Sequence, residues 1–309
     1  MAAYDLVTLG ESMVQLTPVP LGPLAAASTA TVSVAGAEST VASYAARLGW
    51  RTAWVSAVGD DPLGERVLHE VAEAGVDVSH VVRDPVSRTG VYFKDPQPGG
   101  TRVWYYRAGS AASHLGPALA DSLPGARVLH LSGITAALSS SCHELVRRLL
   151  EDRPCTGTVS FDVNVRPALW RGRDAAAPLL RLSRAADVCF VGLDEAAALW
   201  GATTPDDVRD LLPQPQRLVV KDAAVGATAY VRGEPPVHVP ALPVEVVEPV
   251  GAGDAFAAGY LHGLLLGLPE QETLVIGHRL AAASLGVVGD VGAVPDYLPR
   301  PGTTEGQRT

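Results

Sequence analysis

The residues best suited to chemistry stand together in Gly251-Ala252-Gly253-Asp254, at the start of a small and apolar run that predicts a helix. Two glycines that open a helix leave its first backbone N–H groups without partners, and such groups bind anions such as phosphate. A carboxylate in the same turn would repel a phosphate. Asp254 therefore fits a base that takes a proton from an acceptor hydroxyl, while the N–H groups of Ala252, Gly253 and Asp254 stabilise a phosphoryl group in transfer. The alternative is that Asp254 is only the N-cap of the helix.

Two other glycine motifs do not fit the spacing. A dinucleotide-binding fingerprint needs a third glycine three residues after Gly253, where Phe256 stands, and the Gly-Lys-Ser/Thr ending of a P-loop occurs nowhere in the chain. Taken from Glu248 to Tyr260, the stretch resembles the signature of the ribokinase-like (PfkB-type) carbohydrate kinases. This resemblance implies that Asp254 is the catalytic residue of a sugar kinase.

Composition narrows the possible partners. The chain has 309 residues, 47% of them hydrophobic, and a net charge of −9. This charge argues against nucleic acid or an anionic membrane as a partner, so an anionic substrate would need local arginines. The N-terminus lacks a signal-peptide pattern, and no apolar run approaches membrane length. Cys142, Cys155 and Cys189 are odd in number and show no metal spacing, which predicts reduced thiols in a cytoplasmic protein.

The order of strand and helix signals predicts an α/β fold. Apolar runs at 127–133, 158–162, 187–191 and 217–221 alternate with helical stretches, a pattern typical of parallel strands joined by crossover helices. Ligands then bind at the carboxyl ends of the strands. With the family resemblance, we expect a ribokinase-like three-layer fold over 1–309, with a mostly parallel sheet flanked by helices and a small β-sheet lid.

The lid is expected from two segments, about 11–35 and 88–107. Each contains alternating runs, and the second is a predicted hairpin with a Pro- and Gly-rich loop. In the family such a sheet covers the sugar and is often the dimer surface, which implies a homo-oligomer joined through the lid. Tyr92, Tyr106 and Arg107 would point at the sugar. Alternatively, these residues are ordinary surface side chains of the strands.

A turn that leads into an amphipathic helix follows the first lid segment. The family has Gly-Gly-Ala-x-x-Asn here, with the sugar against the backbone and the Asn. In this chain Ala35 replaces the first glycine and Thr40 the Asn. The resemblance implies that Gly36 allows close approach of the sugar and that Thr40 contacts it. An ordinary helix start is the alternative.

Two polar motifs follow predicted strands. Asp162-x-Asn164-x-Arg166 matches a family motif, which implies that Asn164 faces the phosphates and Arg166 the substrate acid. A plain surface loop is the alternative. Glu195 is the remaining member of an Asn-x-x-Glu motif concerned with magnesium and phosphate, because Gly192 stands at the Asn position. Either Glu195 lies toward the magnesium ion, or its negative charge complements the positive N-terminus of a helix.

The nucleotide is expected on the C-terminal segments. Lys221 ends a buried strand, so it reaches phosphate or extends its stem to solvent. Gly226 belongs to the glycine loop that flanks the nucleotide in the family, and Ala282 lies in a second helix, 274–288, against which adenine is held. The loops near Glu248 and 286–293 correspond to family segments that often carry a monovalent cation such as K⁺.

The acceptor is indicated by 107–113, Arg-Ala-Gly-Ser-Ala-Ala-Ser. This segment, with the two tyrosines before it, resembles 2-keto-3-deoxygluconate (2-dehydro-3-deoxygluconate) kinases, and a guanidinium suits a sugar carboxylate. We therefore expect transfer of the γ-phosphoryl group of ATP, with Mg²⁺, to a primary hydroxyl of a keto sugar acid. A ribokinase- or fructokinase-type enzyme for a neutral sugar is one alternative. A sugar-binding regulator without catalysis is the other, because Ala35, Thr40 and Gly192 depart from the family pattern.

Overall fold

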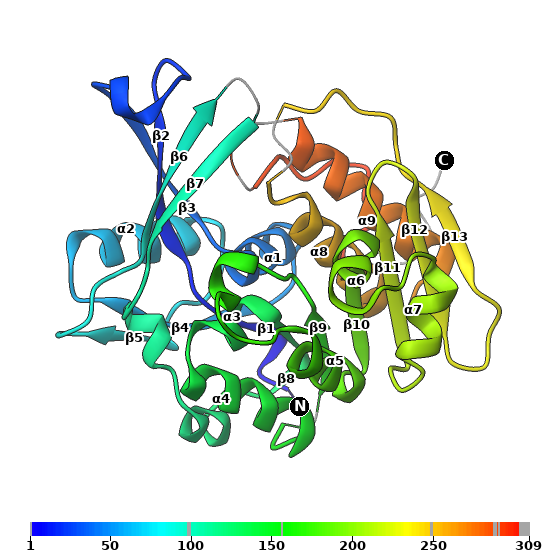
Figure 1. Ribbon diagram of the computed structural model, residues 1–309. Helices are drawn as coiled ribbons and strands as arrows, with labels where there is room; N and C mark the ends of the chain where they lie inside the picture. The colour runs from blue at the N-terminus through cyan, green and yellow to red at the C-terminus, as the bar shows by residue number, and fades with distance from the viewer. Residues whose placement is uncertain are drawn as a thin grey trace.

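The computed structural model describes residues 2–97, 100–155, 157–247, 250–286, 289 and 291–302. Within these residues the chain forms a large sheet and a small sheet, and the small one stands off from the large one (Figure 1). The strand order in the large sheet is β13-β12-β11-β10-β9-β8-β1-β4-β5, and in the small sheet β3-β2-β6-β7. The expected α/β fold with a large, mostly parallel sheet and a smaller second sheet is confirmed.

The large sheet is parallel from β5 to β11, and β12 and β13 extend it in antiparallel fashion. Both faces of its strands are buried, because Leu6 packs on one side and Val7 and Leu9 on the other. This is why β1 reads as a continuous apolar run. The strands are β1 (Tyr4–Leu9), β4 (Thr52–Gly59), β5 (Val81–Asp84), β8 (Ala126–Ser132), β9 (Thr158–Asp162), β10 (Val188–Gly192), β11 (Arg217–Asp222), β12 (Gly226–Val231) and β13 (Val237–Pro240).

Helices cover both faces of the large sheet (Figure 1). Short helical segments fill the connections: η1 (Leu24–Ala26), η2 (Ala111–His114), η3 (Pro117–Asp121), α3 (Gly133–Leu138) and η4 (Pro167–Trp170). One face of the large sheet packs against α4 (Ser140–Glu151), α5 (Ala176–Ala185), α6 (Leu193–Trp200) and α7 (Pro205–Leu211). The other face packs against α1 (Ala37–Arg47), α8 (Ala252–Leu266) and α9 (Glu270–Leu285). The remaining helix, α2 (Pro62–Glu73), packs against β4 and the small sheet.

The small sheet, called the lid sheet below, consists of β2 (Met13–Pro18), β3 (Ala30–Ala35), β6 (Val91–Gln97) and β7 (Gly100–Tyr106). Its strands fall in the two segments that the sequence predicts. β2 pairs with β3 in antiparallel and with β6 in parallel fashion, and β6 and β7 form the expected hairpin. Only residues 10–12 separate β1 from β2, so the lid sheet is attached directly to an interior strand of the large sheet, the third from the β5 edge.

The two C-terminal helices are present but start earlier than the apolar pattern predicts. α8 starts at Ala252, directly after Gly251 and two residues before Asp254, where the apolar run begins. α9 begins at Glu270, four residues before the predicted start, because Pro269 precedes it and Glu270 and Glu272 occupy its first turn. Acidic residues stabilise a helix N-terminus although they interrupt the apolar pattern. Among the described residues, none of the helices has the length and apolar character needed to cross a membrane.

Candidate active site

A cavity of about 630 Å³ lies between the lid sheet and the carboxyl ends of β8 to β11. Residues from the lid segments and from the large sheet face each other across it. We call the first set the lid wall: Glu11, Met13, Tyr92, Lys94, Val103, Tyr105 and Arg107. The second set, the floor wall, comprises Ile134, Asn164, Arg166, Gly192, Asp194, Glu195, Lys221, Ala223, Val250, Gly251, Gly253 and Asp254, with Ala35, Gly36 and Ala37 between the two walls.

The start of α8 forms part of the floor wall. Gly251 is the N-cap, with φ of 85°, a left-handed conformation that glycine adopts at little cost. It offers no side chain to the first turn, so the N–H groups of Ala252, Gly253 and Asp254 lack the usual cap. Asp254 is the third residue of the helix and is 9% exposed. The simple N-cap interpretation of Asp254 therefore does not hold.

Asn164 orients the Asp254 carboxylate. Its Nδ2 donates a hydrogen bond to Asp254 Oδ1 at 3.0 Å, and its backbone N–H donates to Asp162 Oδ1 at 3.2 Å. Asn164 has φ of 35°, a region that Asn tolerates better than most residues. The structure thus brings two predicted residues, Asn164 and Asp254, into direct contact at the cavity.

Lys221 lies beside these residues in an ion pair. Its Nζ donates to Asp162 Oδ2 at 2.7 Å, and a Cβ at Gly253 would lie 3.5 Å from the same Nζ. Burial opposes the charged ammonium, but Asp162 and Glu195 outweigh it and raise the pKa of Lys221. Lys221 is therefore a cation next to the turn that opens α8.

Glu195 is fixed by backbone donors. Its Oε1 accepts from the N–H of Val165 at 2.7 Å and its Oε2 from the N–H of Gly192 at 2.9 Å. Burial, and then the charge of Asp162, raise the pKa of this carboxyl, while Lys221 lowers it. Glu195 thus complements the N-terminus of α6 and lines the cavity at the same time. In the described part of the chain, no three His, Cys, Asp or Glu side chains gather as a metal cluster would.

The base of the lid wall carries a buried ion pair. Arg107 Nε donates to Glu11 Oε2 at 2.6 Å, a second guanidinium nitrogen contacts the same oxygen, and the Ser110 hydroxyl donates to Glu11 Oε1. The guanidinium also lies 5.6 Å from the centroid of the Tyr105 ring. Arg166, on the floor wall, is half-buried and donates from NH1 to Val165 O at 3.1 Å. Two arginines therefore face the same cavity, one from each wall.

Two of the residues predicted to bind the sugar do not reach the cavity. Tyr106 is 68% exposed on the outer face of the lid sheet, where its ring meets that of Phe93. Tyr105 takes the inward position, because it pairs directly with Tyr92 and paired residues share a face of the sheet. Thr40 is buried in α1 and lines a separate small pocket with Ser39 and Ser43.

The lid wall also contains residues that the sequence interpretation did not single out. Lys94 follows Tyr92 by two residues on β6, so both side chains point inward. Alternation applied from Tyr92 would have found Lys94, and the β6–β7 register would have found Tyr105. Glu11 had no such signal, since its role depends on a partner 96 residues away.

A second pocket, of about 640 Å³, adjoins the cavity and shares Lys221, Ala223 and Gly253 with it. Gly226 has φ of 148° and no room for a side chain, because a Cβ would lie 2.4 Å from Val239 O. Most of the lining is apolar, and it includes the expected Gly226 and Ala282. The expected cation loops lie partly outside the described residues, since Glu248, Val287, Val288 and Asp290 fall there.

Comparison with known proteins agrees with this geometry. The profile of the pfkB family of carbohydrate kinases matches residues 3–296. The chain belongs to this family. It is accordingly a phosphotransferase whose acceptor is a sugar hydroxyl.

Relatives in this family resemble the chain over nearly its whole length. It is 37% identical to a 2-dehydro-3-deoxygluconokinase of Thermoproteus tenax, over 95% of this chain and 92% of the relative. A 2-dehydro-3-deoxygluconokinase of Bacillus subtilis (strain 168) is 36% identical, over 99% of this chain and 97% of the relative. The crystal structure of PfkB protein from Polaromonas sp. JS666 superposes with a TM-score of 0.83 at 35% identity, over 91% of this chain and 96% of that one. The crystal structure of fructokinase with bound ATP from Xylella fastidiosa superposes with a TM-score of 0.78 at 25% identity, over 93% of each chain.

Proposed function

We propose that this PfkB-family kinase transfers the γ-phosphoryl group of ATP to the primary hydroxyl of a keto sugar acid, with 2-keto-3-deoxygluconate as the acceptor. The observation that carries the proposal is the pair Arg107 and Arg166, which face one cavity together with Asp254. Arginine presents a planar fork that can hold both oxygens of a carboxylate. The two 2-dehydro-3-deoxygluconokinase relatives support the same acceptor.

The chemistry follows from the floor wall. The acceptor hydroxyl gives its proton to Asp254, whose carboxylate is oriented by Asn164. The acceptor oxygen bonds to the γ-phosphorus as the bond to the bridging oxygen breaks and ADP leaves. The N–H groups of Ala252, Gly253 and Asp254 stabilise the charge on the phosphoryl oxygens, which costs no reorganisation because the turn is already formed.

ATP binds with its base in the pocket lined by Gly226 and Ala282 and with its phosphates toward Lys221 and Asn164. Mg²⁺ bound with ATP would neutralise charge on the phosphates. Glu195 fits an outer position toward this ion, because each of its oxygens accepts one N–H bond and keeps a further lone pair. A monovalent cation such as K⁺ belongs to the loops around 248 and 286–293, and an unchanged rate without K⁺ would contradict this part.

The acceptor lies between the two walls. Gly36 lines the cavity beside the acceptor, and a Cβ there would meet Ser12 and the backbone of Glu11, so glycine lets these two segments pack closely at this place. Tyr92 and Tyr105 contact the sugar, with Tyr105 in place of the expected Tyr106. We assign no sugar contact to Thr40, which lies outside the cavity.

One observation favours a second candidate, a neutral ketosugar. Arg107 is already paired with Glu11, so part of its charge is compensated before any substrate binds. A coupled assay of ADP release over a panel of sugar acids and neutral sugars decides between the two. We expect the highest kcat/KM for 2-keto-3-deoxygluconate. A higher value for fructose or ribose would overturn the assignment, and no turnover with any sugar would point to a binding protein.

The remaining parts of the proposal concern assembly and location. Val32, Trp104 and Tyr106 are exposed on the outer face of the lid sheet, an apolar patch suited to a dimer formed through the lid. A monomer by light scattering at micromolar concentration would contradict this. We take 1–309 as one kinase domain with its lid. The three cysteines are free thiols, which suits a cytoplasmic enzyme.

A further inference from the structure

Lys94 has an unusual position for a lysine. It lies on the inner face of β6, lines the cavity between the two walls and is 3% exposed. Lysine is almost never buried to this extent unless its charge is paired, because removing an ammonium from water is costly. Lys94 takes part in an interaction within the chain.

The position of Lys94 along the lid sheet separates it from the arginines. Arg107 directly follows β7, at the level of Gly90 and Val91, while Lys94 pairs with Val103. The distance along the strand from Val91 to Lys94 is three residues, or roughly 10 Å. A sugar acid whose carboxylate lies at Arg107 and which extends along β6 would have its far end, with the reacting hydroxyl, toward Lys94.

The opposite wall carries the reacting groups. Asp254, Gly253 and Val250 line the same cavity as Lys94. During transfer, charge is spread over the oxygens of the phosphoryl group, and a cation on the side opposite the N–H groups of α8 would stabilise it further.

We propose that Lys94 contacts the phosphoryl group in transfer, as a cation delivered by the lid. This inference rests on the proposed kinase reaction but not on the identity of the acceptor. The lid then adds a second cation, in addition to Lys221, at the phosphoryl group, so the lid would contribute to catalysis as well as to sugar binding.

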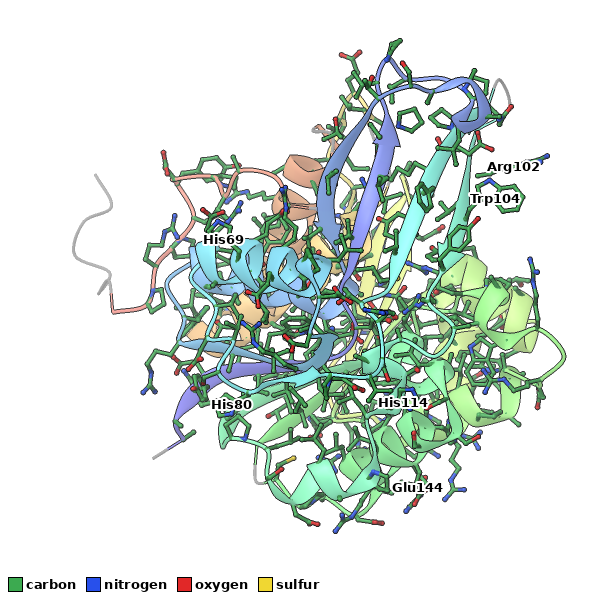
Figure 2. All side chains as sticks on the ribbon, turned by 90° about the vertical axis from the view of Figure 1, so that its left-hand side faces the viewer. His69, His80, Arg102, Trp104, His114 and Glu144 are labelled. Carbon is green, nitrogen blue, oxygen red and sulfur yellow. The ribbon has the colours of Figure 1, made fainter. Side chains whose placement is uncertain are left out.

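The test compares Lys94→Met with a matched control, Arg102→Met. Both changes replace a lid cation by methionine, but Arg102 is exposed on the outer side of β7, where Figure 2 shows it pointing away from the protein beside Trp104. We expect Lys94→Met to lower kcat/KM by about 10- to 100-fold, as for loss of a hydrogen bond to a charged group. Lys94→Arg should recover much of the loss, and Arg102→Met should stay within about twofold of wild type.

A binding measurement separates this role from a structural one. Affinities for ADP and for the non-hydrolysable β,γ-methylene analogue of ATP are measured by calorimetry with Mg²⁺ and acceptor present. Lys94→Met should weaken the analogue by about tenfold or more and leave ADP unchanged, since only the analogue carries the γ-phosphoryl group. Equal weakening of both nucleotides, or no weakening of either, would overturn the proposal.

The outcome is distinguishable from failure of the acceptor assignment. If fructose proves the better substrate, the nucleotide measurement still tests Lys94. If Lys94→Met loses activity only with sugar acids and keeps full activity with neutral sugars, Lys94 contacts the acceptor carboxylate and the phosphoryl assignment is wrong.

Discussion

The two walls of the cavity hold their polar side chains in different ways. On the floor wall, each group is fixed by short contacts to its neighbours: Asp254 by Asn164, Lys221 by Asp162, and Glu195 by two backbone N–H groups. On the lid wall, long side chains of a small sheet reach into the cavity, and the contacts run between lid residues: Arg107 pairs with Glu11 at the base, and the Tyr92 hydroxyl donates to Gln15. The difference indicates that the floor wall sets the reaction, whereas the lid wall adds selectivity and responds to the ligand.

The largest effect is expected from the floor wall. Asp254→Asn keeps the size of the side chain but cannot accept the hydroxyl proton. General-base catalysis contributes roughly 10²–10⁴-fold, so kcat should fall by about that factor while KM changes little. Steady-state ADP release measures both constants. Turnover near that of wild type would reduce Asp254 to a structural residue and remove the functional contrast between the walls.

An intermediate effect is expected from the two arginines. Arg107→Ala and Arg166→Ala should each lower kcat/KM for 2-keto-3-deoxygluconate by about one to two orders of magnitude. Activity on a neutral ketosugar should fall much less, because it presents no carboxylate. Equal losses on both substrates would mean that these arginines serve the fold or the ATP phosphates.

The two arginines should also differ from each other. Arg107→Ala leaves the buried Glu11 carboxylate unpaired, and breaking a buried ion pair costs about 3–5 kcal/mol. The double variant Glu11→Gln, Arg107→Ala should regain part of that stability without regaining activity on the acid. Arg166→Ala should unfold at nearly the wild-type urea concentration. Similar destabilisation by both single variants would contradict the view that the lid wall is anchored by the Arg107 pair.

Acid should lower the free energy of unfolding of the protein through two buried histidines. Burial lowers the pKa of His130, in β8, and of His262, in α8, to about 4. The unfolded chain, with an ordinary pKa near 6.5, binds the proton first, so the free energy of unfolding decreases as the pH falls from about 6.5 to 4. Each histidine should contribute roughly 1–3 kcal/mol to this loss.

Urea unfolding of wild type and His262→Gln at pH 7 and pH 4.5 measures this contribution. His262 accepts from Trp50 Nε1 through Nδ1 and contacts Pro299 O through Nε2, so the neutral ring is satisfied in the folded protein. The variant removes the titrating group and should lose less stability on acidification. An equal loss in both proteins would assign the acid sensitivity to other groups.

The smallest effect is expected in local dynamics. If the lid sheet closes over the ligand, sugar and nucleotide together should slow hydrogen exchange severalfold in β2, β6 and β7 and leave β8 to β10 unchanged. Mass spectrometry of the corresponding peptides provides the measurement. Equal protection of both sheets would mean that the walls respond as one body and would weaken the distinction drawn between them.

The sequence predicts the floor wall better than the lid wall, for a physical reason. Asp254, Asn164 and Lys221 follow buried strands or open a helix, and parallel topology brings such positions to one edge of the sheet. Tyr106 and Thr40 were placed by resemblance, but their directions depend on cross-strand register and on where α1 begins. The Glu11–Arg107 pair depends on a contact distant in sequence, which apolar periodicity does not reveal, whereas strand alternation from Tyr92 does give the inward direction of Lys94. The strand β5 and the antiparallel pair β12 and β13 were likewise not anticipated.

The two walls also occupy different stretches of the chain. The lid wall comes from residues between 11 and 107, and the floor wall from residues between 134 and 254. Because η2 and η3 connect the two stretches and none of their residues lines the cavity, the boundary near residue 115 lies outside the cavity lining. Recombination between related kinases at this boundary would therefore exchange most of the acceptor recognition while the phosphoryl-transfer residues stay together. Arg166 and the base Asp254 are acceptor contacts that would remain on the second stretch.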